Sequence, residues 1–340
     1  MAAQTPRKTN GKKSKKAKAA AVDTAHLTEL YRRMQVIRQA EQRLSELFAD
    51  GEIPGFIHLS IGQEAIAVGV GDALTDTDTL ASTHRGHGHI LAKGVDLELF
   101  FLEIMGKAEG LCKGRGGSMH VADLSVGMLG ANGIVGAGIP IAVGSGLGHQ
   151  VRKTGGCAVV FFGDGALAEG VFHESLNLAA LWSLPVLFVC ENNGWSEFSP
   201  TSTQFNAPVT KFAEVFGIHA EQVDGDDVQA VNEAATRLAA EARAGAPRVL
   251  ECMTHRHHGH FEGDPQRYRD GDELEEAKTF DPLLKTEAVL KANGVSEEDI
   301  QAIRDEVKAK VDAATEKGRA GTEPDFEAAV ADVYTEVSGA

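Results

Sequence analysis

The clearest pattern of apolar and polar positions in the chain lies between Cys157 and Trp195. Two apolar runs, Cys157 to Phe162 and Val186 to Glu191, flank a segment at 168–181 that we predict to be a helix. Continuous apolar runs rich in Val and Phe, separated by a helical segment, are typical of a β-α-β unit in a parallel sheet. This unit predicts an α/β protein.

The rest of the chain predicts further elements of the same kind. From Thr24 to Asp50, apolar residues recur at steps of three and four, which indicates an amphipathic helix ending at Gly51. From about Asp281 the chain becomes a series of polar segments rich in Ala, Glu and Lys, which we interpret as a C-terminal helical appendage. We predict strands at 79–82, 217–223 and 248–253, helices at 139–153, 211–216 and 228–243, and three regions at 1–22 (tail), 23–280 (α/β domain) and 281–340 (appendage).

Polar clusters follow both strands of the central unit. Gly163-Asp164-Gly165 follows the first strand, and Asn192-Asn193-Gly194 follows the second. Open α/β sheets bind ligands beyond the carboxyl ends of their strands, and carboxylate and amide oxygens suit Mg²⁺ and the phosphate oxygens it holds. Gly-Asp-Gly alone is ordinary turn chemistry. The Asn pair one crossover later favours a metal–phosphate site instead.

Gly163-Asp164-Gly165 followed by Asn192-Asn193 resembles the thiamine-diphosphate fingerprint of transketolase-like enzymes. More narrowly, nearly everything after the first two dozen residues resembles the α subunits of heteromeric E1 components, as in the pyruvate, branched-chain 2-oxo acid and acetoin dehydrogenase complexes. The resemblance implies a thiamine-diphosphate-binding fold with a parallel sheet flanked by helices. It also implies two cofactors, thiamine diphosphate and Mg²⁺.

The resemblance assigns the metal to the side chains of Asp164 and Asn193 and to the backbone carbonyl of Trp195. A backbone ligand tolerates Trp where relatives more often have Tyr. Around the diphosphate it implies Gly163, Asp164, Gly165, Ala166 and Asn193.

His84-Arg85 begins a run that also contains His87 and His89. Three histidines at two-residue spacing suggest a metal site, but no carboxylate or cysteine accompanies them as in common zinc patterns. A phosphate-facing loop is the better interpretation, because Arg can grip two phosphate oxygens at once. The family commonly has Tyr-Arg here, both contacting the diphosphate, so Arg85 is expected to bind it and His84 to donate beside it.

A glycine-rich segment at 106–133 has little periodicity, and loops of this length in a compact domain are usually functional or disordered. His120 within it either faces the site or serves packing. After it, the resemblance places Gly133 and Val135 against the aminopyrimidine ring, with Ile134 in the same apolar wedge. Glycine lets the backbone approach a ligand closely.

A second histidine cluster follows the last predicted strand, with His255, His257, His258 and His260. The resemblance identifies His258 as the active-site histidine, which is expected to contact the cofactor, donate to substrate or intermediate oxygens and assist transfer to a lipoyl group. Imidazole suits this role because it exchanges a proton near neutral pH. A metal site using the cluster with Asp264 is the less favoured alternative.

In this family the carboxylate that activates the cofactor comes from the β subunit. The resemblance therefore implies an α2β2 heterotetramer, inactive as isolated chains, that serves a lipoyl-bearing E2 component. Animal pyruvate dehydrogenase α subunits carry a regulatory serine after His-Gly-His, but Phe261 stands here and no serine follows through Arg269. Control by phosphorylation at that loop is not expected.

Several stretches resemble the acetoin branch: PGFIHLSIGQEA, STHRGHGHILAKG, LGANGIVGAGIPIAVG and FHESLNLAALW. Pyruvate is the alternative substrate, a branched-chain 2-oxo acid is less favoured, and a non-catalytic diphosphate-binding subunit is remote. These substrates differ by small changes in shape, and one methylene in an apolar pocket changes discrimination by only about 1–3 kcal/mol. Phe56, His58 and Leu59 are the first positions to inspect for substrate selection.

Composition and charge limit the classes of binding partner that we expect. The net charge is −16, yet residues 1–22 carry seven basic and no acidic side chains, so the body is more acidic still. An acidic body argues against nucleic-acid binding. The sequence contains no apolar run long enough to span a bilayer, no secretory signal pattern and no CxxC pair among its four cysteines, which predicts a cytoplasmic protein with reduced thiols. We expect the basic tail to be disordered and solvated.

Overall fold

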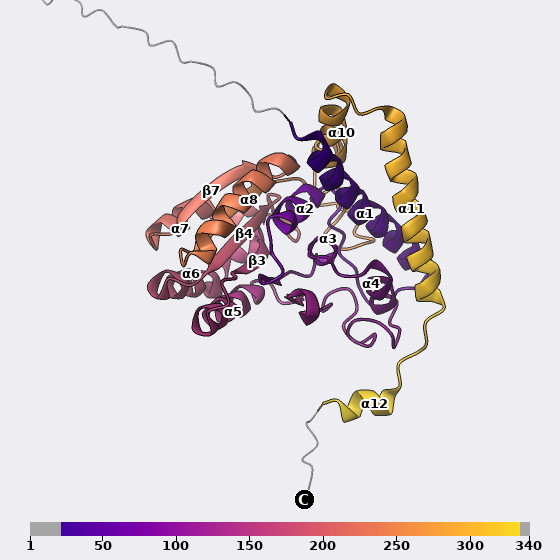
Figure 1. Cartoon of the computed structure of the whole chain (residues 1–340), viewed down its shortest axis with the longest axis horizontal. Helices are drawn as coiled ribbons and strands as arrows, with labels where there is room; N and C mark the ends of the chain where they lie inside the picture. Colours follow the sequence, from indigo (N-terminus) through magenta and orange to yellow (C-terminus); the bar gives the residue numbers. More distant parts are fainter. Residues whose placement is uncertain (1–21, 334–340) are drawn as a thin grey trace, which may run out of the picture.

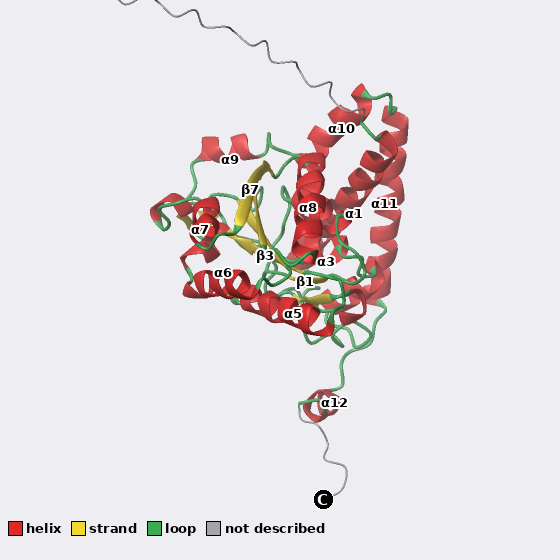
Figure 2. Cartoon of the chain, turned by 60° about the vertical axis from the view of Figure 1, so that its left-hand side comes forward, coloured by secondary structure: helices red, strands yellow, loops and turns green. Residues whose placement is uncertain are grey.

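The computed structural model describes residues 22–333, so the predicted tail lies outside the described residues except for Val22. Its centre is a six-stranded sheet of order β2-β1-β3-β4-β8-β7, in which every neighbouring pair is parallel (Figure 2). A short antiparallel hairpin stands apart from this sheet. The sheet strands are β1 Thr79–Ala81, β2 Met128–Gly130, β3 Ala158–Gly163, β4 Val186–Asn192, β7 His219–Asp224 and β8 Arg248–Met253, and the hairpin strands are β5 Trp195–Ser196 and β6 Ser199–Pro200.

Helices surround the sheet and extend beyond it (Figure 1). In chain order they are α1 Thr24–Ala49, α2 Glu64–Asp72, α3 His87–Ala92, α4 Leu97–Ile104, α5 Gly138–Arg152, α6 Gly170–Trp182, α7 Val209–Val215, α8 Val228–Arg243, α9 Gly271–Ala277, α10 Pro282–Ala292, α11 Glu297–Arg319 and α12 Phe326–Ala331.

The two faces of the sheet pack against different helices. Along β3, Val160 and Phe162 belong to a buried cluster with residues of α5, α6 and α7, whereas Val159 and Phe161 belong to a second cluster with residues of α1, α2 and α8. Successive side chains of a strand point to opposite faces, so a strand covered on both faces must be apolar throughout. The predicted fold class, a parallel sheet flanked by helices, is confirmed.

The C-terminal helices share the core with the beginning of the chain. Leu290 of α10 and Val307 of α11 are fully buried in the same cluster as Leu30 and Met34 of α1. Figure 1 shows α11 lying alongside α1. The boundary at residue 280 stays a prediction, since these helices are packed onto the body. Within residues 22–333 no helix combines the length and the apolarity needed to cross a membrane.

The histidine run after β1 differs from its prediction as a loop. Helix α3 begins at His87, directly after the cap residue Gly86. The rings of His87 and His89 are buried and hydrogen-bonded within the core, at 3.1 Å from Glu41 and 3.0 Å from Glu191 respectively. The helix therefore separates these two histidines from His84. Helices α4 and α9 were not predicted.

One buried carboxylate organises the first part of the glycine-rich segment 106–133. Glu103, at the buried face of α4, accepts hydrogen bonds from four backbone N–H groups at 2.7 to 3.1 Å. These donors belong to Cys112, Gly114, Gly116 and Gly117. Because backbone groups saturate the carboxylate, a segment without regular structure still has a fixed path.

We expect Glu103→Ala to lower the free energy of unfolding by about 3 kcal/mol or more, because four backbone donors lose a charged acceptor. Urea unfolding measures the loss, and limited proteolysis should cleave the variant between residues 106 and 133. Glu98→Ala, an exposed position of the same helix, is the matched control. Equal stability of the two variants would contradict the role assigned to Glu103.

Candidate active site

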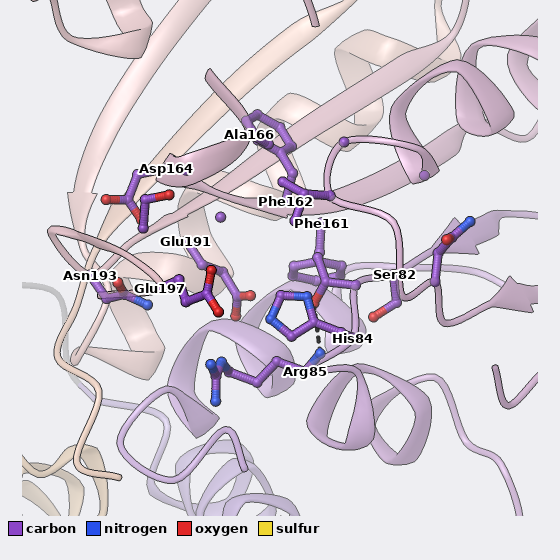
Figure 3. Close-up of a pocket in the computed structure, with 18 of the residues that line it drawn as sticks. Ser82, His84, Arg85, Phe161, Phe162, Asp164, Ala166, Glu191, Asn193 and Glu197 are labelled. Carbon is purple, nitrogen blue, oxygen red and sulfur yellow. Dashed lines mark hydrogen bonds between the residues drawn. The ribbon is translucent and has the colours of Figure 1, made fainter. Parts of the chain in front are cut away.

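A pocket lies at the carboxyl ends of four neighbouring strands of the sheet. Figure 3 shows part of its lining, with Asp164 and Asn193 to the left of His84 and Arg85 in that view. The segments that follow β1, β3, β4 and β8 each contribute, which is the position expected for a ligand site in a parallel sheet. Its polar and charged lining residues are Gln63, Ser82, Thr83, His84, Arg85, Asn132, Asp164, Glu191, Asn193, Ser196, Glu197, Arg256 and His260.

Asp164 follows the last residue of β3 and is 1% exposed. Its Oδ2 accepts a hydrogen bond from the hydroxyl of Thr201, but its Oδ1 has no partner among the described residues. Burial raises the pKa of this carboxyl group to about 6, and the Thr201 hydroxyl opposes the shift. A buried carboxylate oxygen without a partner at a pocket wall is suited to a cation.

Two arginines line the same pocket without an ion-pair partner in residues 22–333. Arg85 is 6% exposed and donates to the carbonyl oxygens of Leu59 at 2.6 Å and His260 at 2.9 Å. Arg256 is 2% exposed and donates to the His258 carbonyl and the Tyr268 hydroxyl. Burial, followed by the charge of Arg256, lowers the pKa of Arg85 to about 9. Buried guanidinium groups held by neutral acceptors leave a positive potential for an anion.

Asn193 lies one residue beyond β4, so β3 and β4 bring it near Asp164. Its Oδ1 accepts from the Trp195 N–H at 3.1 Å, and its Nδ2 donates to Gln63 at 3.4 Å. The backbone turn that results places Trp195 at the pocket, where it is also a lining residue. The two predicted metal side chains and the predicted backbone ligand thus surround one space.

The two glycines beside Asp164 have different roles. A Cβ on Gly163 would have no atom within 4 Å, so the bare backbone leaves open space at the pocket wall. A Cβ on Gly165 would lie 2.6 Å from the Ser196 hydroxyl, which makes glycine a packing requirement there. Ala166 lines the pocket as well.

The segment before α5 forms an apolar edge of the pocket. Ile134 and Val135 both line it and are 71% and 48% exposed. Gly133 is not among the lining residues, whereas Gly136 is. The apolar edge thus runs from Ile134 to Gly136, and the predicted contact of Gly133 and Val135 with the aminopyrimidine ring stays a prediction.

The second histidine cluster places His260, and not His258, at the pocket. The His258 ring pairs with Glu262 at 3.2 Å, and Glu262 also accepts from Ser45. His255 stacks on Phe280 with ring centroids 4.1 Å apart. The active-site role of His258 stays a prediction, and the structure offers His260 as a second candidate, because a loop has no periodicity that could tell neighbouring histidines apart.

Sequence reasoning missed four charged or polar residues of the lining. Glu191 is the polar residue at the end of an otherwise apolar run, and its Oε1 lies 3.0 Å from His89 Nε2, within hydrogen-bond distance. Gln63 directly precedes α2, and Arg256 lies among the histidines of the second cluster, so neither residue belongs to a motif of its own. Glu197 sits in the hairpin with a φ of 52°, which no sequence pattern signals.

The donor set fits a metal-bound diphosphate. An orphaned carboxylate oxygen and an amide stand on one side, and two buried arginines supply the positive charge that a diphosphate needs. Within residues 22–333 no cationic group pairs with the Asp164 oxygen, and no carboxylate pairs with either arginine. The arrangement is therefore suited to a ligand that carries both a cation and an anion.

Several known proteins are similar to this chain. A family model described as dehydrogenase E1 component matches residues 32–327. The α subunit of acetoin:2,6-dichlorophenolindophenol oxidoreductase from Cupriavidus necator is 46% identical over 327 residues, covering 94% of this chain and 98% of the relative. The subunit of the same name from Bacillus subtilis is 52% identical over 246 residues, covering 72% and 74%. The pyruvate dehydrogenase E1 component α subunit from Zymomonas mobilis is 42% identical over 295 residues, covering 85% and 83%.

Because Asp164 Oδ1 has no partner among the described residues, we predict that this carboxylate lowers the stability of the folded chain without metal and cofactor. Its folded-state pKa of about 6 lies above the ordinary value of 3.8, so the folded chain binds more protons between these pH values and loses stability as pH rises through them. We expect Asp164→Asn to raise the free energy of unfolding at pH 7.5 by about 1–3 kcal/mol in the absence of metal and cofactor. Urea unfolding at pH 7.5 and at pH 4 measures this gain, which should shrink at the lower pH.

Asp76→Asn, at an exposed position, is the control and should change little. Lower stability of Asp164→Asn than of the wild type at pH 7.5 would show that the carboxylate is satisfied in a way the geometry does not indicate.

Proposed function

The chain belongs to the dehydrogenase E1 component family, and we propose that it is the α subunit of a thiamine-diphosphate-dependent oxidoreductase that acts on acetoin. Two relatives named for acetoin support this substrate, at 46% and 52% identity. The 42% identical relative named for pyruvate dehydrogenase supports oxidative decarboxylation of pyruvate as the second candidate. Both reactions use the same cofactor chemistry.

The observation that carries the proposal is the unsatisfied charge of the pocket. The buried Asp164 oxygen without a partner and the two buried arginines without carboxylates are costly in a folded chain unless a ligand compensates them. Mg²⁺ and a diphosphate compensate both at once. A non-catalytic scaffold subunit would gain nothing from keeping this arrangement.

Thiamine diphosphate, when bound, supplies a carbon nucleophile and an electron sink. In our proposal the side chains of Asp164 and Asn193 and the carbonyl oxygen of Trp195 hold Mg²⁺. Arg85 and Arg256 neutralise the diphosphate, and the open backbone at Gly163 lets it approach closely. Ile134 and Val135 support the apolar part of the cofactor.

His260 is the histidine that we propose for substrate chemistry, in place of His258. It lines the pocket, and its carbonyl oxygen accepts from Arg85, so the same guanidinium positions the loop. Burial, followed by the charge of Arg85, lowers the pKa of His260 to about 4, and nearby Asp264 opposes the shift. The imidazole is therefore neutral at pH 7 and has a free nitrogen that accepts a proton.

A partner subunit is part of the proposal, as the relatives are named as α subunits. The apolar pocket edge formed by Ile134 and Val135 is largely exposed, which supports its coverage by a β subunit in an α2β2 assembly. The carboxylate that activates the cofactor would come from that subunit. A lipoyl-bearing E2 component would then accept the acetyl group in the full complex.

We expect acetoin-dependent reduction of 2,6-dichlorophenolindophenol by the chain co-purified with its β subunit in the presence of thiamine diphosphate and Mg²⁺. The isolated chain should show less than about 1% of this rate, since its site is open on one side. Pyruvate and 2-oxoisovalerate are the comparison substrates. Full activity of the isolated chain would refute the two-subunit site, and a preference for pyruvate would select the second candidate function.

We also expect His260→Ala to lower kcat/KM for acetoin by about 100-fold or more, the usual scale of a lost proton-transfer group. His258→Ala should lower it less than tenfold, because that ring pairs with Glu262 outside the pocket. Steady-state kinetics of the two variants in the α–β complex decides between them. The reverse order would restore His258 as the active-site histidine.

A further inference from the structure

The last helix that the structure describes, α12, does not share in the core. None of its residues is buried, and its two large apolar side chains, Phe326 and Val330, are 75% and 52% exposed. Residues four apart lie on the same face of a helix, so these two form an apolar stripe that is open to solvent. Val333, in the turn that follows, is 65% exposed. Figures 1 and 2 both show α12 projecting beyond the end of α11.

Polar contacts hold α12 at both of its ends. Thr322, ahead of the helix, donates through its N–H at 3.0 Å and through its hydroxyl at 2.9 Å to the carboxylate of Glu109. Asp332, which follows the helix, pairs with Lys113 and Arg115 at 2.7 Å each. Isolated helices shorter than about 12 residues are marginal in water, so these anchors hold α12 in place while its apolar stripe stays open.

The segment that anchors α12 continues directly to the open edge of the pocket. Met119 follows Arg115 by only four residues, which span at most about 14 Å. Its sulfur lies 3.9 Å from the place that a Cβ on Gly133 would occupy. Gly133 precedes Ile134 and Val135, the exposed apolar side chains of the pocket edge. The stripe of α12 and the pocket edge therefore belong to neighbouring parts of one surface.

The charge of the segment around α12 limits what can cover the stripe. Residues 321–333 carry four acidic side chains and no Lys, Arg or His, and the whole chain has a net charge of −16. Two copies of so acidic a chain repel each other, which disfavours a second copy as the occupant. The surface that matches this helix is an apolar groove with basic side chains at its rim, entered by residues one helical turn apart.

We propose that α12 is a docking helix for the β subunit, which receives Phe326 and Val330 in an apolar groove with a basic rim. The inference rests on the proposed function, in which a β subunit covers the neighbouring pocket edge, and it names a second part of this chain that the same subunit contacts. The family model ends at residue 327, so most of α12 lies beyond the region on which the family assignment rests.

The test measures the dissociation constant of the full-length chain and the separately purified β subunit by analytical ultracentrifugation. We expect the double variant Phe326→Ser, Val330→Ser to raise this constant by about 10-fold or more, since both apolar anchors are lost. Ala328→Ser, on the opposite face of the same helix, is the control and should change it by less than about twofold. Urea unfolding of the isolated double variant should match the wild type, because both side chains are exposed.

The basic rim has a test of its own. Glu327 is exposed beside the stripe, and Glu327→Lys should raise the dissociation constant more than Glu327→Gln does, because it adds repulsion to the loss of attraction. The difference between the two variants should shrink when NaCl rises from about 0.05 M to about 0.5 M. Tighter binding of Glu327→Lys than of the wild type would contradict a basic rim.

The outcomes separate this inference from the proposed function. If wild-type chain and β subunit form no complex, the proposed partner is refuted. If they form one and the double variant binds equally well, only the docking helix is refuted. Self-association of the isolated chain that the double variant abolishes, with β binding unchanged, would assign the stripe to a second copy instead. Lower urea stability of the isolated double variant would show that the stripe packs within its own chain, which also overturns the proposal.

Discussion

The guanidinium group of Arg85 is the contact on which the arrangement of the site depends. It is buried, it lacks a carboxylate partner among residues 22–333, and it joins the segment before α2 to the loop after β8 through two carbonyl oxygens. A buried guanidinium with only neutral acceptors is an expensive feature of a folded chain. Arg85 lies in the segment that follows β1. There its guanidinium group both fixes the loops of the pocket and presents positive charge to a ligand.

Local pattern made the central part of the fold predictable. Strands β3 and β4 are covered on both faces, so they appear in the sequence as continuous apolar runs, and the polar residues that follow them must lie at the sheet edge. Asp164 and Asn193, which the sequence places after these two strands, both line one pocket in the structure. Arg85 and Val135 reached the same pocket through the family resemblance, not through periodicity.

Long-range contacts made the rest unpredictable. Helix α3 begins at His87 because Glu41 and Ser118, from distant segments, receive its buried ring. Likewise, the carboxylate of Glu103 orders a glycine-rich segment that has no periodic pattern of its own. The difference between His258 and His260 depends on which ring a loop turns inward, and spacing carries no information on that point. His58 joins the site from a segment some 200 residues away from His260.

The pocket therefore combines two kinds of unsatisfied group that need different partners. Asp164, Arg85 and Arg256 are charged, so a cation and an anion compensate them. The neighbouring rings of His58, His84 and His260 have lowered pKa values and are neutral at pH 7. Each neutral imidazole has one N–H that can donate to an anion and one bare nitrogen that needs a donor such as a hydroxyl group. The separation of charged and neutral groups within one pocket is thus itself an argument for two ligands, a cofactor that is held tightly and an uncharged substrate that is turned over beside it.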